Sequence, residues 1–193
     1  MNGDGEVTAV DKTAIGGTRI PEIVYGFGAT VSYKSFDLGV FFQGTGKTYQ
    51  LLGGETWLPG SSLGAGNIYS NIDDRWTPEN PRQDVFWPRM GDKAVANNEQ
   101  ASTWWLRDMS FLRLKNLELG YTLPQRWTTK IGIRSCRLFA RGTNLLTFSD
   151  FKLWDPELET TDGLRYPQMK SVSVGFSINS VSYTHLTLPT KRI

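Results

Sequence analysis

Paired carboxylates are the side chains of this sequence that come nearest to catalytic chemistry. Asp73 and Asp74 adjoin in one polar segment, and Asp155 and Glu157 lie two positions apart in another. Two carboxyl groups at the right separation can hydrolyse a glycosidic bond, but the sequence does not fix their separation, and carboxylates in polar loops are normally solvated. The single histidine is His185, so residues 1–180 offer neither a Ser-His-Asp triad nor a histidine-based metal site. We therefore expect no enzymatic activity.

Residues 2–11, NGDGEVTAVD, have the spacing of a calcium-binding loop that lacks its first ligand. The twelve-residue loop of the EF-hand takes ligands from its third, fifth, seventh and twelfth positions and has a glycine at the sixth. These positions are occupied here by Asn2, Asp4, Glu6 and Asp11, with Gly5 at the turn. Aspartate is a poorer bidentate ligand than glutamate at the last position. A polar surface turn rich in Asn, Asp and Gly is the alternative, and no cofactor other than calcium is expected.

Tryptophans lie in two long polar connections, residues 45–103 and 148–167. Flat aromatic faces suit the apolar faces of sugar rings. The candidate residues for contact with a ligand or a partner protein are Trp57, Trp76, Trp87 and Trp154. The alternative is that these rings pack the loops against their neighbours.

Five segments alternate between apolar and polar residues, and a period of two indicates β-strands. The predicted strands span residues 22–33, 36–44, 104–123, 136–147 and 168–179. A two-residue turn at Lys34-Ser35 would join the first two as a hairpin. The sequence therefore predicts an all-β fold with antiparallel strands.

The third predicted strand, residues 104–123, contains an irregularity, because its apolar residues change face near residues 115–116. A β-bulge would absorb this slip and leave Arg113 facing water. Trp104 and Trp105 begin the segment, and adjacent tryptophans at a strand end fit an aromatic girdle at a membrane interface. Ordinary core packing of these two rings is the alternative.

The predicted hairpin has large apolar residues on one face and Gly, Thr, Ser, Asp and Gln on the other. Such an apolar face is either the core of a soluble β-sandwich or the lipid-facing side of an outer-membrane barrel. Connections as long as residues 45–103 are uncommon in compact soluble domains, whereas barrels alternate short turns with long loops. The order of connections favours the barrel. A soluble β-sandwich carbohydrate-binding module is the alternative.

Four segments resemble, in the same order, motifs of the SusC/RagA-type TonB-dependent outer-membrane transporters. They are RIPEIVYGFGATVSYKSFDLGVFFQG, LRLKNLELGYTLP, GTNLLTFSDFKLWDPE and YPQMKSVSVGFSIN. The resemblance covers nearly all of residues 1–180. It implies about five C-terminal strands of a 22-stranded antiparallel transmembrane barrel with long extracellular loops.

The resemblance also implies how the whole transporter works. Family members lie in the outer membrane of Gram-negative bacteria, cross it many times and pair with a SusD-like surface lipoprotein. They import oligosaccharides or peptides with energy relayed by TonB to an N-terminal plug. The sequence contains neither a plug nor a TonB box, so we expect these residues to be a piece of a longer protein, and the substrate is left open.

Residues 181–193, VSYTHLTLPTKRI, differ in character from the preceding strand and resemble the translation of a sequencing adapter. We therefore expect residues 1–180 to be the receptor part and this tail to be non-native. Without Lys191 and Arg192 of the tail, basic and acidic residues number 19 each, which gives a nucleic-acid partner no electrostatic support. Cys136 is the single cysteine, and we expect it to be a small apolar residue on a strand.

Overall fold

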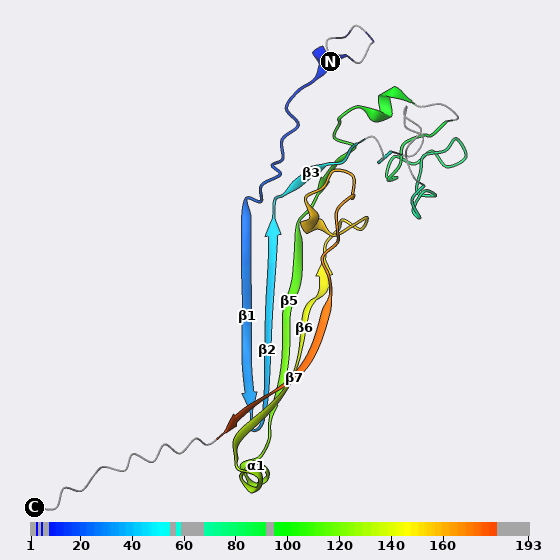
Figure 1. Ribbon diagram of the computed structural model, residues 1–193. Coiled ribbons are helices and arrows are strands. Elements are labelled where there is room, and N and C mark those ends of the chain that lie inside the picture. The colour runs from blue at the N-terminus through cyan, green and yellow to red at the C-terminus, as the bar shows by residue number, and fades with distance from the viewer. Residues whose placement is uncertain are drawn as a thin grey trace, which may run out of the picture. The chain divides into compact units, whose positions relative to one another are not determined.

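The computed structural model describes residues 3, 5, 8–54, 57–58, 68–91 and 95–180. Strands dominate this part of the chain and form a five-stranded sheet in the order β1-β2-β5-β6-β7 and a two-stranded sheet of β3 and β4. Successive strands of the larger sheet run in opposite directions (Figure 1). Its helices are short, and in the described residues none has both the length and the apolarity needed to cross a membrane.

The five strands of the larger sheet confirm the predicted antiparallel all-β fold. They are β1 (Ile23–Tyr33), β2 (Phe36–Gly46), β5 (Phe111–Thr122), β6 (Ile133–Phe148) and β7 (Ser171–Ser180). Lys34 and Ser35 form the predicted turn between β1 and β2, and Lys34 has a left-handed backbone with φ of 54°. The connection between β5 and β6 is also short.

Short helices and turns occupy the connections. They are η1 (Ala9–Asp11), η2 (Ala96–Glu99), α1 (Gln125–Thr128), η3 (Thr129–Ile131) and η4 (Pro156–Leu158). Gly132 ends η3 with φ of 72°, a left-handed conformation that glycine adopts without steric cost. The chain then enters β6 directly.

The prediction of one strand over residues 104–123 is wrong. Two strands, β4 (Leu106–Asp108) and β5, lie in this region, and β4 pairs with β3 (Tyr49–Leu51) instead of extending the larger sheet. Trp104 and Trp105 precede β4 in a turn, where their indole N–H groups donate to backbone oxygens of the loops at 3.1 and 2.8 Å. Trp105 is 4% exposed, so it packs in a core and does not form part of an aromatic girdle.

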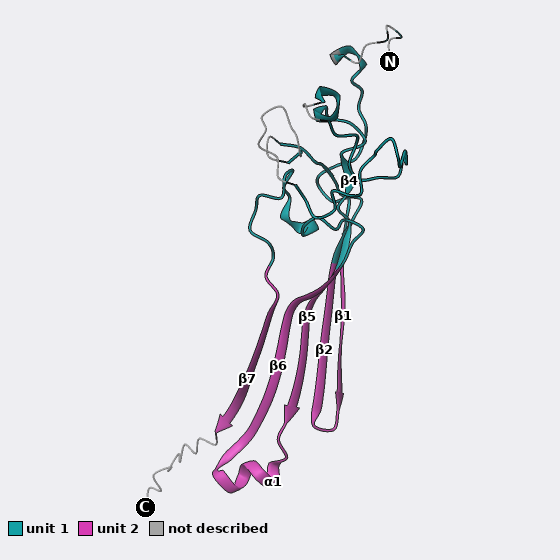
Figure 2. Cartoon of the chain, turned by 90° about the vertical axis from the view of Figure 1, so that its right-hand side faces the viewer, with its two compact units in different colours: residues 1–25, 44–112, 148–168 teal, residues 26–43, 113–147, 169–193 magenta. Residues whose placement is uncertain are grey.

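Two compact units divide the chain (Figure 2). Unit 1 comprises Met1–Tyr25, Gly44–Leu112 and Phe148–Gln168, and it includes the described parts of both long loops. Unit 2 comprises Gly26–Gln43, Arg113–Thr147 and Met169–Ile193, and it includes most of the five-stranded sheet.

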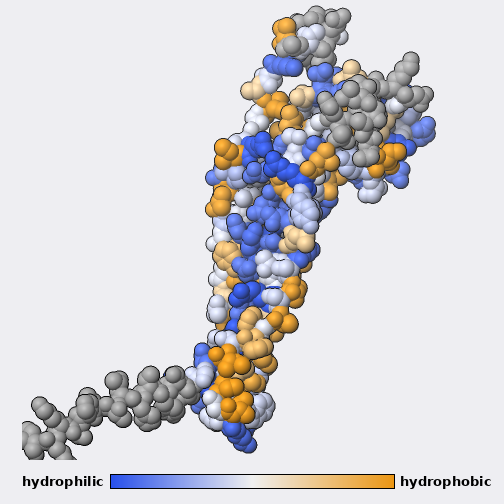
Figure 3. Space-filling model, viewed as in Figure 1, coloured by the Kyte–Doolittle hydropathy of each residue, from blue (hydrophilic) through white to orange (hydrophobic). Residues whose placement is uncertain are grey.

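Unit 2 exposes the apolar face of its sheet. Val172, Val174 and Phe176 on β7 are 74%, 81% and 69% exposed, and apolar residues of β1 and β2 are exposed as well. The Phe36 and Tyr121 rings lie 4.7 Å apart, which places the apolar residues of β2 and β5 on one face. Hydrophobic residues are visible along the strands in Figure 3. Within the described residues no second sheet covers this face, so they do not form a closed sandwich.

Arg113, at the start of the unit 2 part of β5, departs from the prediction. We expected its side chain to face water, but it is 0% exposed. A buried guanidinium needs hydrogen-bonding or charged partners to offset its loss of hydration, and alternation alone does not reveal such partners.

Candidate ligand-binding loops and polar strand face

An aromatic cluster forms the core of unit 1. Trp57 lies at its centre, 2% exposed, with five rings around it at centroid distances of 5.1 to 6.2 Å. These rings belong to Tyr69, Phe86, Trp87, Trp105 and Trp154. The surrounding loops have little regular secondary structure, so mutual burial of aromatic rings is the main apolar contact that holds them together.

The four predicted tryptophans fall into two groups. Trp57 and Trp87 are buried, and other rings occupy the space around them, so in this arrangement a sugar ring has no exposed face to stack on. They take the packing role that the sequence left open. Trp76 and Trp154 are half-buried. Arg89 lies 5.7 Å from the Trp76 ring centre, and contact of Trp76 or Trp154 with a ligand stays a prediction.

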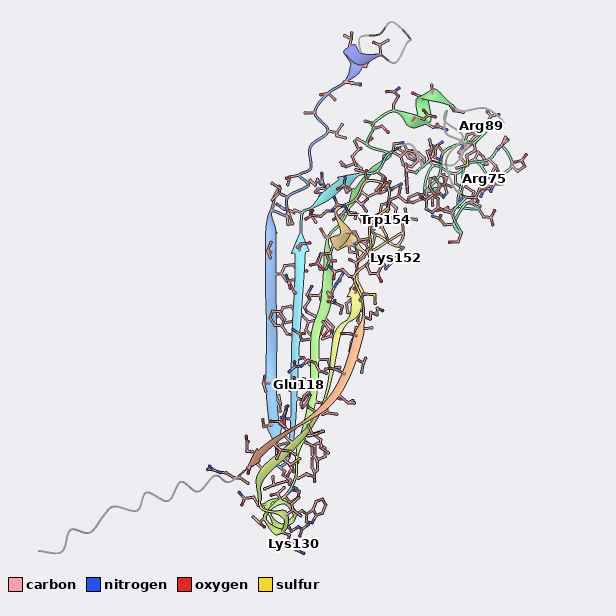
Figure 4. All side chains as sticks on the ribbon, in the orientation of Figure 1. Arg75, Arg89, Glu118, Lys130, Lys152 and Trp154 are labelled. Carbon is pink, nitrogen blue, oxygen red and sulfur yellow. The ribbon has the colours of Figure 1, made fainter. Side chains whose placement is uncertain are left out.

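A cavity of about 440 Å³ lies within unit 1, beside the aromatic cluster. Residues from three segments of the chain line it: Asn71, Asp74, Phe86, Leu106, Arg107, Asp108, Asp150, Phe151, Lys152 and Leu153. It combines an aromatic wall with groups of both charges. Figure 4 marks Lys152 beside Trp154 on the second loop. Sequence reasoning did not find this cavity, because its lining residues are far apart in the chain.

Arg107 lines this cavity and has a polar atom without a hydrogen-bond partner among the described residues. Its guanidinium stacks on Phe86, with 4.6 Å between the guanidinium carbon and the ring centre. Burial lowers the pKa of Arg107 below its ordinary value, although an arginine keeps its proton at neutral pH. Its Nε is buried without a hydrogen-bond partner in the described part of the chain. Because Arg107 lines the cavity, a carboxylate or another oxygen-rich group of a ligand would accept a hydrogen bond from its guanidinium.

The carboxylates singled out in the sequence have local structural roles. Asp74 accepts hydrogen bonds from the Phe86 backbone N–H and from Arg82, both at 3.1 Å. Asp155 accepts from the Glu157 N–H at 2.9 Å and caps η4. These contacts support the solvated or structural interpretation of the carboxylates.

Two further groups in the loops have shifted pKa values. The Thr160 hydroxyl donates to Asp162 at 2.7 Å, and the Leu164 N–H donates at 3.0 Å, and these bonds lower the pKa of the Asp162 carboxyl. Burial, and then the charge of Asp162, raise the pKa of Tyr69. At neutral pH Asp162 is therefore charged and Tyr69 is neutral, as both groups ordinarily are. Neither shift favours a role in acid–base catalysis.

The polar face of the sheet in unit 2 carries an ion network across three strands. Arg137 on β6 donates to both oxygens of Asp37 on β2, at 3.0 Å from its Nε, and to Glu118 on β5 at 2.7 Å. Arg141 donates to the same Glu118 at 2.7 Å. A Cβ at Gly120 would overlap the Asp37 and Arg137 side chains, so glycine leaves the room that this pair occupies. Figure 4 labels Glu118 within the sheet.

This network lines a second cavity, of about 360 Å³, in unit 2. Thr30 and Asn116 complete its polar lining. Alternation along β6 accounts for the position of Arg137 and Arg141 on the polar side, but it gives no information on their cross-strand partners. Asp37 and Arg137 are 100 positions apart, and only the strand register brings them together.

The candidate calcium loop is only partly described. Asn2, Asp4 and Glu6 lie outside the described residues. Asp11 accepts a hydrogen bond from the Thr8 N–H at 3.0 Å. Calcium binding by Asn2, Asp4, Glu6 and Asp11 therefore stays a prediction. Cys136 is buried and forms no disulfide.

Comparisons with known proteins agree with the resemblance seen in the sequence. The chain is 32% identical to the TonB-dependent receptor P26 of Formosa agariphila, over 92% of the chain and 19% of that receptor. It is 25% identical to the TonB-dependent receptor SusC of Bacteroides thetaiotaomicron, over 92% of the chain and 17% of SusC. No protein-family model matches.

Solved structures show the same similarity in three dimensions. The RagAB peptide transporter matches with a TM-score of 0.69 and 29% sequence identity, over 90% of this chain and 19% of the matched chain. The RagAB peptide importer in its open-open state matches with the same TM-score and 28% identity, again over 90% and 19% of the two chains.

An antiparallel sheet that alternates short turns with long loops and exposes one apolar face has the features of the wall of a membrane β-barrel. The fold is thus part of a TonB-dependent receptor barrel. Within that class, the chain belongs to the SusC/RagA type. It spans about a fifth of the length of the receptors it matches.

Proposed function

We propose that this chain is part of the barrel wall and loops of a nutrient importer in the outer membrane. The observation that carries the proposal is the contrast between the two faces of the sheet. Large apolar side chains are exposed on one face, and a charged network with glycine beside it lies on the other. In water such an exposed apolar face would be unfavourable, whereas contact with lipid hydrocarbon would bury it.

The proposed activity belongs to the whole receptor, of which this chain is a part. Its expected partners are a SusD-like surface lipoprotein, TonB acting through a plug, and outer-membrane lipid. The expected substrate is an oligosaccharide or a peptide. The matched RagAB structure is described as a peptide importer. Peptides are therefore one candidate class of substrate for the receptor that contains this chain.

Within this importer, the cavity beside Arg107 is the proposed place of substrate contact in the loops. A ligand carboxylate or a sugar hydroxyl would accept from the guanidinium, and Phe86 holds that group in place through its ring face. Asp108 and Lys152 offer groups of both charges in the same cavity. The mixture suits a ligand with several polar groups better than a purely apolar one.

Uptake by cells tests this function. Cells that carry the whole receptor are compared with cells that lack it, using labelled pools of oligosaccharides and peptides, with and without TonB. The expected result is uptake of one pool that needs both the receptor and TonB. Arg107→Gln should lower the apparent affinity for that pool by about tenfold, the effect of one lost charged hydrogen bond. Arg19→Gln, on an exposed arginine outside the cavity lining, is the matched control.

Unchanged uptake of both pools in cells without the receptor would contradict the importer. A soluble carbohydrate-binding module, the alternative from sequence, has no support from the fold, because the described residues leave the apolar face of the sheet uncovered. The relatives found are receptors and transporters.

A further inference from the structure

An apolar groove of about 830 Å³ lies on the exposed face of the sheet in unit 2. Its apolar lining comes from four strands: Phe36, Leu119, Tyr121, Leu138, Val174 and Phe176. Ala140 lies within the groove opposite Val174 and contributes only a methyl group, which leaves space between larger neighbours. The groove therefore has the chemistry and form to hold a hydrocarbon chain.

Four cations lie at the end of the sheet where this groove begins, three on the short connections and one at the start of β6. They are Lys34, Arg126, Lys130 and Arg134, and all are exposed. The Thr122 N–H donates to the Ser35 carbonyl at 2.8 Å, so the β1–β2 turn lies beside the end of β5, from which the chain continues into α1. Figure 4 labels Lys130 at this connection, and Figure 3 shows hydrophobic residues gathered next to it.

The connection between β5 and β6 contains no acidic residue, and Asp37, three positions from Lys34, is paired with Arg137. From residue 119 to residue 149 the sequence contains five basic residues and no Asp or Glu. None of the four cations takes part in an ion pair within the part of the chain that the structure describes. The charged side chains of Lys34 and Arg126 lie 5.1 and 5.8 Å from the adjacent Tyr33 and Trp127 rings. The exposed cations would contact the lipid headgroup, the amphipathic rings would lie at the membrane interface, and the apolar groove would contact an acyl chain.

We propose that this surface binds an anionic phospholipid of the leaflet on the side of the short connections. One acyl chain would lie in the groove over Ala140, and the lipid phosphate would contact Lys34, Arg126, Lys130 and Arg134. An anionic headgroup is favoured over a zwitterionic one, because the patch offers four cations and no carboxylate to receive a headgroup ammonium. The proposal depends on the proposed membrane location of the sheet.

Native mass spectrometry of the whole receptor tests the proposal. The receptor is purified in detergent and titrated with phosphatidylglycerol or phosphatidylcholine of equal chain length. The test variant combines Lys34→Gln, Arg126→Gln, Lys130→Gln and Arg134→Gln. The matched control removes four exposed cations of unit 1 by Lys12→Gln, Lys47→Gln, Arg89→Gln and Arg165→Gln. Heat-modifiable migration on gels shows that each variant is folded, and Lys130→Gln alone serves if the combined variant does not fold.

The wild-type receptor and the control should retain phosphatidylglycerol more strongly than phosphatidylcholine. The test variant should lose at least about tenfold in phosphatidylglycerol affinity, since each basic residue near a bilayer surface contributes roughly a fivefold factor. Lys130→Gln alone should lose about fivefold. Ala140→Leu, which fills the groove, should weaken both lipids by a similar factor.

Two results would overturn the proposal: equal retention of the two lipids by the wild-type receptor, or undiminished phosphatidylglycerol binding by the test variant. Failure of the membrane location itself would look different. The receptor would then stay monodisperse in water without detergent and would bind neither lipid.

Discussion

Loops and strands of this chain reverse the usual distribution of apolar residues. In unit 1, Trp57 and Trp87 lie in irregular segments and are buried among other rings. In unit 2, Val174 and Phe176 lie in a regular strand and are among the most exposed apolar residues of the described chain. A water-soluble domain normally buries its strands and exposes its loops.

The reversal has one physical explanation. A loop region in water must build its own core, and here aromatic rings supply it. A strand in a bilayer needs no protein partner on its apolar face, because lipid tails cover that face. The hydrophobic effect therefore explains both units. It buries tryptophans against other protein rings in unit 1, and it favours contact of the exposed valines of unit 2 with lipid.

Of the substitutions considered, Trp87→Ala should cause the largest loss of stability, and this loss should be confined to unit 1. Removal of a fully buried tryptophan costs about 3 to 5 kcal/mol, so the unit 1 loops should open and become cleavable by protease while the barrel stays folded. Limited proteolysis of the whole receptor, without any ligand, measures this. Trp76→Ala, on a half-buried ring, should change cleavage much less. Equal cleavage of the two variants would argue against the aromatic core.

Val174→Lys tests the lipid-facing side. A lysine on the lipid face near the bilayer midplane costs about 2 to 4 kcal/mol, so the folded fraction in membranes should fall. The matched change is Ser171→Lys on the other face of β7, where Thr143 is the cross-strand partner. Urea unfolding in lipid vesicles compares the two. If the two lysines cost the same, the two faces do not differ in their surroundings.

Gly44→Ala probes the packing where β2 belongs to unit 1. A Cβ at Gly44 would overlap the Phe111 carbonyl oxygen and the ring of Tyr25, whose hydroxyl donates to that oxygen at 3.2 Å. Overpacking of this kind costs about 1 to 3 kcal/mol. Gly39→Ala on the same strand meets only the Thr30 hydroxyl at 3.8 Å and should be nearly neutral. Unfolding midpoints that rank the other way would refute this packing.

The ion pair between Asp37 and Arg137 should contribute the smallest of these effects. Both side chains are partly exposed, so solvent weakens the attraction. A double-mutant cycle with Asp37→Asn and Arg137→Gln should give a favourable coupling energy that is smaller than the effects of the preceding substitutions. A coupling energy near zero would mean that the ion pair between β2 and β6 does not stabilise the sheet.

The sequence predicted the parts of this fold that local alternation determines. The turn at Lys34-Ser35 and the strands on either side were placed to within about two residues of the observed bounds. The exposure of the apolar face also followed from alternation together with loop lengths. The turn and the strand bounds depend on residues that are neighbours in the chain. The exposure of the apolar face depends on the surrounding solvent, which the alternation and the loop lengths together indicate.

Features that depend on long-range contacts were not predicted. Trp104 and Trp105 fit a strand by pattern, yet hydrogen bonds to loop backbone place them in a turn. The burial of Arg113 and the partnership of Asp37 with Arg137 arise from tertiary structure and strand register. Likewise, the distinction between the buried Trp87 and the half-buried Trp76 requires knowledge of how the loop folds.

Solvent accessibility along β7 tests the central claim most directly. Single cysteines at positions 173 and 174, in the whole receptor with Cys136→Ser, carry a nitroxide in lipid vesicles. If the apolar face contacts lipid, the label at 174 should collide mainly with oxygen, and the label at 173 with a water-soluble nickel complex. Equal collision of the two labels with the nickel complex would contradict the account.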